Sequence, residues 1–231
     1  MKSDEIELLG IIILEPAVSF LDILTGLLGF LLAYFLWKNK SSEKSMKLFM
    51  YYFLFTGLTS FCAGIIGHGL LYYISPDWKI VGWSLSAFGM FFLEFASIEY
   101  FKNELSPSLF MNMKIVIKVQ LIVFFISLLF PVTRSFSNVQ INAAFSYIGI
   151  ILPLYSYSIY SWKIHKSWFV IAAIILACII ALVYNMKITL NQWFNYDVFT
   201  HVLVAMYVLL IYYAVNRLNS FKQGFYIKLN Q

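Results

Sequence analysis

Residues 168–187 read WFVIAAIILACIIALVYNMK, an apolar run with its only charge at the last position. An α-helix needs about 20 mostly apolar residues to cross the hydrocarbon core of a bilayer. Six other stretches have the same character, and the sequence therefore predicts seven transmembrane helices, at about residues 15–37, 48–74, 81–101, 115–133, 139–161, 168–187 and 197–216. Because the connections are short, we expect residues 1–231 to form a single all-α domain, a polytopic seven-helix transmembrane bundle.

The overall composition is typical of a membrane protein. Hydrophobic residues make up 61% of the chain and charged residues 12%, and the mean hydropathy is +0.81. Soluble globular proteins carry about 25% charged residues, so this chain has too little polar surface to cover a water-exposed body. The net charge is +5, but no lysine-rich run is interleaved with exposed aromatic residues. We therefore expect membrane lipid as a partner and no nucleic acid.

Basic residues are divided unequally between the two ends of the predicted bundle. Of the 16 Lys and Arg residues, one end receives only Lys2, Lys79, Arg134 and Lys187, and the other end receives the rest. Lysine and arginine collect in the cytoplasmic loops of membrane proteins. The sequence thus predicts an integral, multi-pass protein of the cell membrane, with its N-terminus outside and its C-terminus in the cytoplasm.

The first predicted span carries three polar residues on one helical face. Glu15, Ser19 and Asp22 are spaced i, i+4 and i+7, which places them together near the outer end. An ionisable side chain inside the bilayer costs about 2.5–3.5 kcal/mol on insertion scales, so each needs a reason. Glu15 is also consistent with an interfacial first-turn carboxylate that the helix dipole stabilises. Asp22 lies deeper, and this simple explanation does not extend to it.

Two further spans carry polar residues toward the same membrane face. In the second span a small or polar stripe ends in His68, with Ser60 two turns earlier. Small residues in such a stripe also serve close helix packing. In the last span Asp197 and His201 are i and i+4 and project from one helical face.

Two imidazoles and a carboxylate suit zinc, which in catalytic sites takes three protein ligands and a water. We predict that His68, Asp197 and His201 hold zinc, and that Asp22, Glu15 and Ser60 are catalytic candidates, the carboxylates as orienting groups or general bases. A hydrogen-bonded cluster without metal is the alternative, with His201 paired to Asp197 or Asp22. Clusters of this kind also serve proton relays and transport pathways.

The run YDVFTHVLV, residues 196–204, resembles the last-helix motif of the progestin/adiponectin receptor family. Together with the outer-end histidine of the second span, it resembles the CREST superfamily, which includes the alkaline ceramidases. That resemblance implies seven helices around a zinc-dependent amide hydrolase site. By it His68 is the second-helix ligand, and Asp197 and His201 are the last-helix ligands, with Asp197 where those families have histidine. The pattern E-P-x-x-x-x-x-D, residues 15–22, is also similar to small uncharacterised bacterial seven-helix proteins.

Two functions follow as hypotheses. The first is a zinc-dependent membrane hydrolase that cleaves a lipid-like amide or ester from the outer-leaflet side. The second is a non-catalytic transporter, receptor or sensor that uses the same cluster for a ligand or protons. Glu94, about midway through the third span, favours the second hypothesis if it shares a cavity with His68 and His201. It is equally consistent with a protonated, hydrogen-bonded packing residue.

Overall fold

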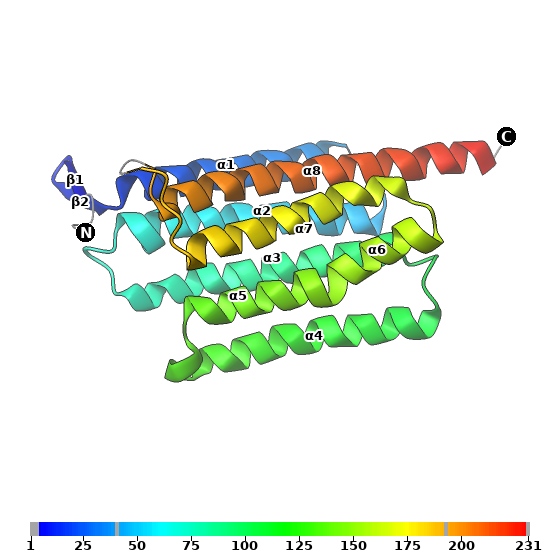
Figure 1. The fold of residues 1–231 in the computed structure, drawn as a ribbon, viewed down its shortest axis with the longest axis horizontal. Coiled ribbons are helices and arrows are strands. Elements are labelled where there is room, and N and C mark those ends of the chain that lie inside the picture. The colour runs from blue at the N-terminus through cyan, green and yellow to red at the C-terminus, as the bar shows by residue number, and fades with distance from the viewer. Residues whose placement is uncertain (1–4, 40–41, 192–193, 230–231) are drawn as a thin grey trace.

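The computed structural model of the protein describes residues 5–39, 42–191 and 194–229; Lys2, used above to orient the chain, lies outside these ranges. The described chain is an all-α bundle whose helices run along its long axis (Figure 1). Its α-helices are α1 Pro16–Lys38, α2 Lys44–Cys62, α3 Lys79–Tyr100, α4 Pro107–Leu129, α5 Phe136–Ala144, α6 Leu152–Ser161, α7 Trp168–Asn185 and α8 Tyr196–Leu229.

Seven helical segments are long and apolar enough to cross a membrane, as expected of a multi-pass membrane protein. They are Pro16–Lys38, Lys44–Gly69, Pro76–Tyr100, Pro107–Leu129, Phe136–Ser161, His165–Asn185 and Tyr196–Ser220. The predicted count and order are confirmed. The largest difference in where a helix starts is at α4, which begins eight residues before the predicted start at 115. Helix α8 continues 13 residues past the predicted end at 216, to Leu229. Pro107 occupies the first turn, and the side chain of Ser106 accepts a hydrogen bond from the backbone N–H of Leu109, so these residues start the helix early.

Two of the seven segments contain a π-helical stretch. Helix η1, Ala63–Gly69, continues α2, and helix η4, Phe145–Ile151, joins α5 to α6. Pro153 follows η4 directly after Leu152, and a proline in a helix interior removes a backbone donor. Stretches of π-helix are rare and are frequent at functional sites. His68 lies in η1.

A β-hairpin precedes the bundle, where the sequence predicted no element. Strands β1, Glu5–Leu8, and β2, Ile11–Leu14, pair antiparallel. The turn residues Leu9 and Gly10 have φ of 52° and 78°, as a two-residue hairpin turn with positive φ requires. The backbone N–H of Ile12 donates to the hydroxyl of Tyr73 at 3.0 Å, which ties the hairpin to the chain just after η1. We call this end of the bundle, where α1 and α8 also begin, the hairpin end (Figure 1).

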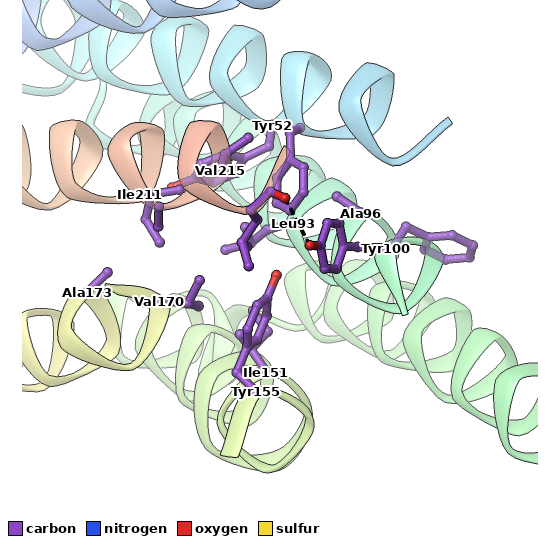
Figure 2. Close-up of a cluster of buried hydrophobic side chains, with 14 of the residues drawn as sticks. Tyr52, Leu93, Ala96, Tyr100, Ile151, Tyr155, Val170, Ala173, Ile211 and Val215 are labelled. Carbon is purple, nitrogen blue, oxygen red and sulfur yellow. Dashed lines mark hydrogen bonds between the residues drawn. The ribbon is translucent and has the colours of Figure 1, made fainter. Parts of the chain in front are cut away.

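Helices α1 and α2 approach closely because glycines face each other. A Cβ added at Gly29 would lie 2.7 Å from the Cα of Gly57, so neither position has room for a side chain. Toward the opposite end, large buried side chains fill the core, including Tyr52 of α2, Tyr155 of α6 and Ile211 of α8 (Figure 2). Helix α4 lies at the edge of the bundle. The close contact between α1 and α2 therefore fixes the direction in which the polar face of α1 points within the bundle.

Candidate metal centre

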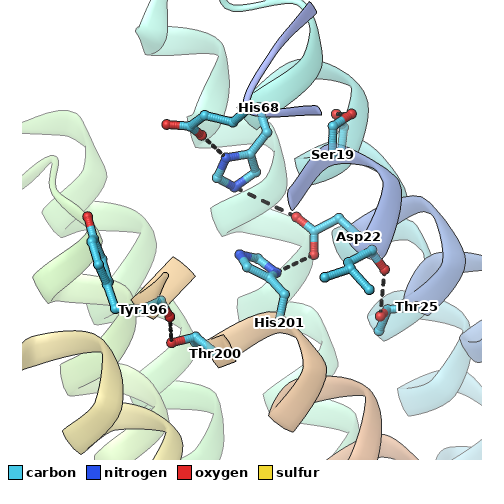
Figure 3. Close-up of polar contacts among 10 residues, drawn as sticks. Ser19, Asp22, Thr25, His68, Tyr196, Thr200 and His201 are labelled. Carbon is cyan, nitrogen blue, oxygen red and sulfur yellow. Dashed lines mark hydrogen bonds and ion pairs between the residues drawn. The ribbon is translucent and has the colours of Figure 1, made fainter. Parts of the chain in front are cut away.

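Three side chains from three segments converge at the hairpin end of the bundle. Asp22 of α1, His68 of η1 and His201 of α8 each offer one ligand atom, and these atoms lie within 4.8 Å of one another (Figure 3). Nδ1 of His201 lies 2.6 Å from Oδ1 of Asp22, and the two imidazole rings meet at 84° with centroids 5.4 Å apart. Asp22 is only 2% exposed, so its carboxylate depends on these neighbours.

One oxygen of Asp22 is left without a hydrogen bond among the described residues. Oδ2 is buried and lies 3.7 Å from Nε2 of His68, which is too long for a hydrogen bond. Two ligand atoms of a tetrahedral zinc, each bonded at about 2.0–2.2 Å, are separated by about 3.3–3.6 Å. The gap between Oδ2 and Nε2 is close to this spacing, whereas Oδ1 of Asp22 and Nδ1 of His201 lie at a hydrogen-bond distance of 2.6 Å. One carboxylate and two imidazoles are ligand types that zinc accepts.

Glu15 sets the orientation of the His68 ring. Its Oε2 lies 2.5 Å from Nδ1 of His68. The hydrogen bond with His68 lowers the pKa of Glu15 from its ordinary value of 4.5, and the group is therefore a carboxylate at neutral pH. Since a carboxylate only accepts, Nδ1 of His68 carries the proton and donates it, and Nε2 of a neutral ring presents a lone pair toward Asp22. A carboxylate behind a metal-binding histidine commonly has this orienting role.

The backbone at Glu15 is strained in a way that serves this contact. Glu15 has φ 50° and ψ 53°, the left-handed region, and it directly precedes Pro16. A non-glycine residue in this region costs of order 1–3 kcal/mol and persists only where its surroundings hold it. Here the β-hairpin on one side and α1 on the other hold the carboxylate against His68.

Close packing of α1 against η1 positions His68. The hydroxyl of Ser19 donates to the carbonyl oxygen of Gly64 at 2.7 Å. A Cβ at Gly64 would lie 2.7 Å from the carbonyl oxygen of Ser19, so only glycine permits this approach. The predicted polar face of Glu15, Ser19 and Asp22 is thus the face of α1 that meets the π-helix.

A cavity of about 350 Å³ opens beside the three converging side chains. Its polar walls include Asp22, Ser60, His68, Asp197 and His201, and its apolar and aromatic walls include Trp78, Trp83, Phe136, Val139 and Tyr184. Glu94 is not among the residues that line it. The cavity therefore pairs a polar cluster with a surface that suits a hydrocarbon chain.

The predicted site residues lie together, but one predicted ligand takes a different position. Asp22, proposed from the sequence as a catalytic group, is the carboxylate within ligand distance of both imidazoles, whereas Asp197 lies on the cavity wall outside that group. Asp197 occupies the first turn of α8, one turn before His201, while Asp22 lies level with the His201 ring. Glu15 and Asp22, which the i, i+7 spacing placed on one helical face, each contact one of the two histidines.

In the described residues, seven apolar helices with a cluster of buried Asp22 and partly buried His68 and His201 at one end define a multi-pass membrane protein with a candidate metal centre. Within that class, the chain belongs to a family of unknown function, DUF6962, whose model matches residues 17–220. The match spans all three segments that supply the cluster. No significant match to a curated protein or to a solved structure was found.

Proposed function

We propose that this protein is a zinc-dependent membrane hydrolase that cleaves a lipid-like amide or ester, and that it is a distant relative of the CREST superfamily. The observation that carries the proposal is the convergence of Asp22, His68 and His201, with an unpartnered Asp22 oxygen facing His68, on a partly apolar cavity. Asp22 replaces the predicted Asp197 in the ligand set.

Each residue of the centre has a distinct task in this proposal. Asp22, His68 and His201 would hold zinc, which would supply Lewis acidity and make a water at the site acidic near neutral pH. Glu15 keeps Nδ1 of His68 protonated and its ring aimed at Asp22. Asp197 is then the carboxylate on the cavity wall that is left to accept and return a proton, and Ser60 adds a hydroxyl to the same wall.

The substrate class follows from the walls of the cavity. Trp83, Phe136 and Val139 line it together with the polar cluster, so it suits a molecule with an apolar chain beside a polar linkage. The excess of lysine and arginine at the opposite end supports an orientation with the hairpin end outside. We therefore assign the site to the outer-leaflet side of the cell membrane.

The alternative function is a transporter, receptor or sensor that uses the cluster to bind a ligand or protons. It drew support from Glu94, a carboxylate deep in the bundle. Because Glu94 does not line the cavity that holds His68 and His201, that support does not extend to this cluster. The hydrolase is the function that the cavity favours.

Metal analysis of the detergent-purified protein tests the proposal. We expect about one zinc per chain in the wild type and in His165→Ala, which removes the exposed histidine of helix η5, His165–Ser167, at the opposite end. We expect His68→Ala to lose the zinc. Absence of zinc from the wild type, or zinc that persists in His68→Ala, ends the proposal.

Turnover separates the two functions once the metal is established. A panel of long-chain amides and esters with fluorogenic leaving groups is offered to the wild type and to His68→Ala in lipid nanodiscs. The hydrolase predicts cleavage that His68→Ala abolishes. Bound zinc with no cleavage of any panel member favours the receptor, sensor or transporter.

A further inference from the structure

A second polar cluster lies within the bundle, apart from the candidate metal centre. Glu94 of α3 is 1% exposed, and the side chains of Gln120 of α4 and Ser146 of η4 lie beside its carboxylate. Nε2 of Gln120 lies 3.0 Å from Oδ1 of Asn142 of α5 and 2.8 Å from the hydroxyl of Ser146. Gln120 and Ser146 therefore lie beside the Glu94 carboxylate, and Asn142 joins the cluster through Gln120.

Hydrogen bonding within this cluster leaves some of its buried oxygens without a partner. The Nε2 amide of Gln120 has two hydrogens, yet three oxygens surround it: Oδ1 and the backbone carbonyl of Asn142, at 3.0 and 3.2 Å, and the Ser146 hydroxyl. The Ser146 hydroxyl donates its own hydrogen to the carbonyl of Asn142 at 3.1 Å. In the described part of the chain, Oε1 of Glu94 and Oε1 of Gln120 are both buried without a partner.

Unpartnered buried acceptors are costly, and native proteins satisfy nearly all of them. A single positively charged group bound among these oxygens would satisfy several of them at once. A hard cation coordinated by carboxylate, amide, hydroxyl and carbonyl oxygens meets this need, because such cations select oxygen ligands. The oxygens of the cluster belong to these four chemical types.

The charge of the cluster selects a monovalent cation. Glu94 is its only carboxylate, and no described lysine, arginine or histidine forms an ion pair with it. In the low-dielectric interior of the bundle a site is least costly when its net charge is zero. One monovalent cation neutralises one carboxylate, whereas a divalent cation leaves an excess positive charge.

A groove on the surface of the bundle borders this cluster. It has a volume of about 400 Å³, lies between α4 and α5, and is lined by Gln120 and Asn142 as well as by Ser127 and Asn138. Ser127 and Asn138 lie near the end of α4 and the start of α5, which are both at the hairpin end. Nδ2 of Asn138 donates to the Ser127 hydroxyl at 2.5 Å. Most of its walls are apolar, including Val119, Val123 and Ile141, and it meets the cluster at Gln120 and Asn142.

We propose that Glu94, Gln120, Asn142 and Ser146 form a binding site for a monovalent cation such as sodium. The cation lies among the oxygens of α3, α4, α5 and η4 and ties the edge helix α4 to the bundle. The site is independent of the zinc centre, since its residues and those of the zinc cavity are different.

Thermal unfolding of the purified protein in sodium chloride, compared with choline chloride at the same ionic strength, tests this site. We expect Tm to rise in sodium by about 5–10 °C when sodium is about 100-fold above its Kd. Glu94→Gln keeps the shape of the side chain and removes its charge, and the sodium response should disappear. Glu99→Gln is the matched control, because Glu99 lies on the same helix but pairs with Lys44 at 3.1 Å, and its response should equal that of the wild type.

Two results overturn the proposal. The first is a wild-type Tm that does not respond to sodium, accompanied by an infrared carbonyl band of a protonated carboxyl that Glu94→Gln removes; a proton then satisfies the cluster. The second is a sodium response that persists in Glu94→Gln, which places any sodium elsewhere. If Glu94→Gln does not fold, Gln120→Leu and binding of radioactive sodium to the wild type decide the same question.

Discussion

The two polar clusters of this molecule are built on a similar plan. Each places one carboxylate of a long helix, Asp22 or Glu94, against a segment that includes π-helix, η1 or η4. In each, one carboxylate oxygen is buried without a hydrogen bond among the described residues. In both clusters, therefore, a buried carboxylate lies beside backbone that departs from the regular α-helix.

The side chains that face the two carboxylates differ, and this difference decides the chemistry. Asp22 faces two imidazoles, whose nitrogens bind zinc and other borderline metals. Glu94 faces an amide and a hydroxyl, which offer only oxygen acceptors to a cation. The first cluster also lines a cavity with apolar walls, so a substrate has room beside it. We therefore infer catalysis at the first cluster and simple cation binding at the second.

Removal of a zinc ligand is the strongest test of this contrast. We expect Asp22→Asn and His201→Ala each to reduce bound zinc from about one per chain to near none, because a three-ligand site does not retain the metal on two. Glu94→Gln should keep full zinc content. The measurement is elemental analysis of protein purified in parallel. Equal zinc loss in Glu94→Gln and Asp22→Asn would show that the two clusters are not independent.

Asp197→Asn separates proton transfer from metal binding within the first cluster. Asp197 lies on the cavity wall outside the ligand group, so zinc content should match the wild type. Turnover should fall by about 10²–10⁴-fold, the usual contribution of a general base. Cleavage of the best panel substrate is measured beside the sodium-dependent Tm, which should not change. Loss of zinc from Asp197→Asn would restore Asp197 to the ligand set predicted from the sequence.

Glu15→Gln removes the charge behind His68 and leaves the side-chain shape. We expect zinc affinity to fall by about 10–100-fold, as is usual when an orienting carboxylate behind a histidine is lost. Competition with a fluorescent chelator measures the affinity. Glu7→Gln is the control, because Glu7 is an exposed glutamate of strand β1. An affinity for Glu15→Gln equal to that of Glu7→Gln would mean that the Glu15–His68 contact does not support the metal.

The number and order of the helices were predictable from the sequence because each span is a long apolar run with polar ends. Burial in lipid leaves little ambiguity in such a pattern. The start of α4 was not predicted correctly, because Lys114 and Lys118 interrupt the apolar run. The helix begins before these lysines, at Ser106 and Pro107. The hairpin was missed because its strands are only four residues each and their apolar residues merge with the first span.

The members of the metal centre were largely predictable, but their roles were not. Helical spacing placed Glu15, Asp22, His68, Asp197 and His201 at one depth, and the structure places them at one end of the bundle. Spacing within α8 made Asp197 the natural partner of His201. Which carboxylate reaches the imidazoles depends on how α1 rotates against α2, and that rotation is set by glycine contacts between the helices. A pattern along one helix does not carry this information.

The smallest expected effect comes from one methyl group placed in each π-helix. In Gly64→Ala the new Cβ would lie 2.7 Å from the backbone oxygen of Ser19, whereas in Gly149→Ala it would meet only the ring of Phe145 at 3.8 Å. Overpacking against backbone costs about 1–3 kcal/mol, so we expect Gly64→Ala to lower Tm by about 2–12 °C. Gly149→Ala should be neutral or stabilising by up to about 1 kcal/mol, because alanine is the better helix former.

Zinc affinity completes this comparison of the two π-helices. Gly64 lies one helical turn before His68, so a shift of η1 away from α1 also moves the imidazole away from Asp22. We therefore expect zinc affinity to fall in Gly64→Ala but not in Gly149→Ala. Thermal unfolding and chelator competition on the same preparations give both quantities. Equal losses of Tm and zinc affinity in the two variants would mean that any π-helical glycine is sensitive to an added methyl group. A loss confined to Gly64→Ala locates the sensitivity in the contact between α1 and η1, where the metal centre is assembled.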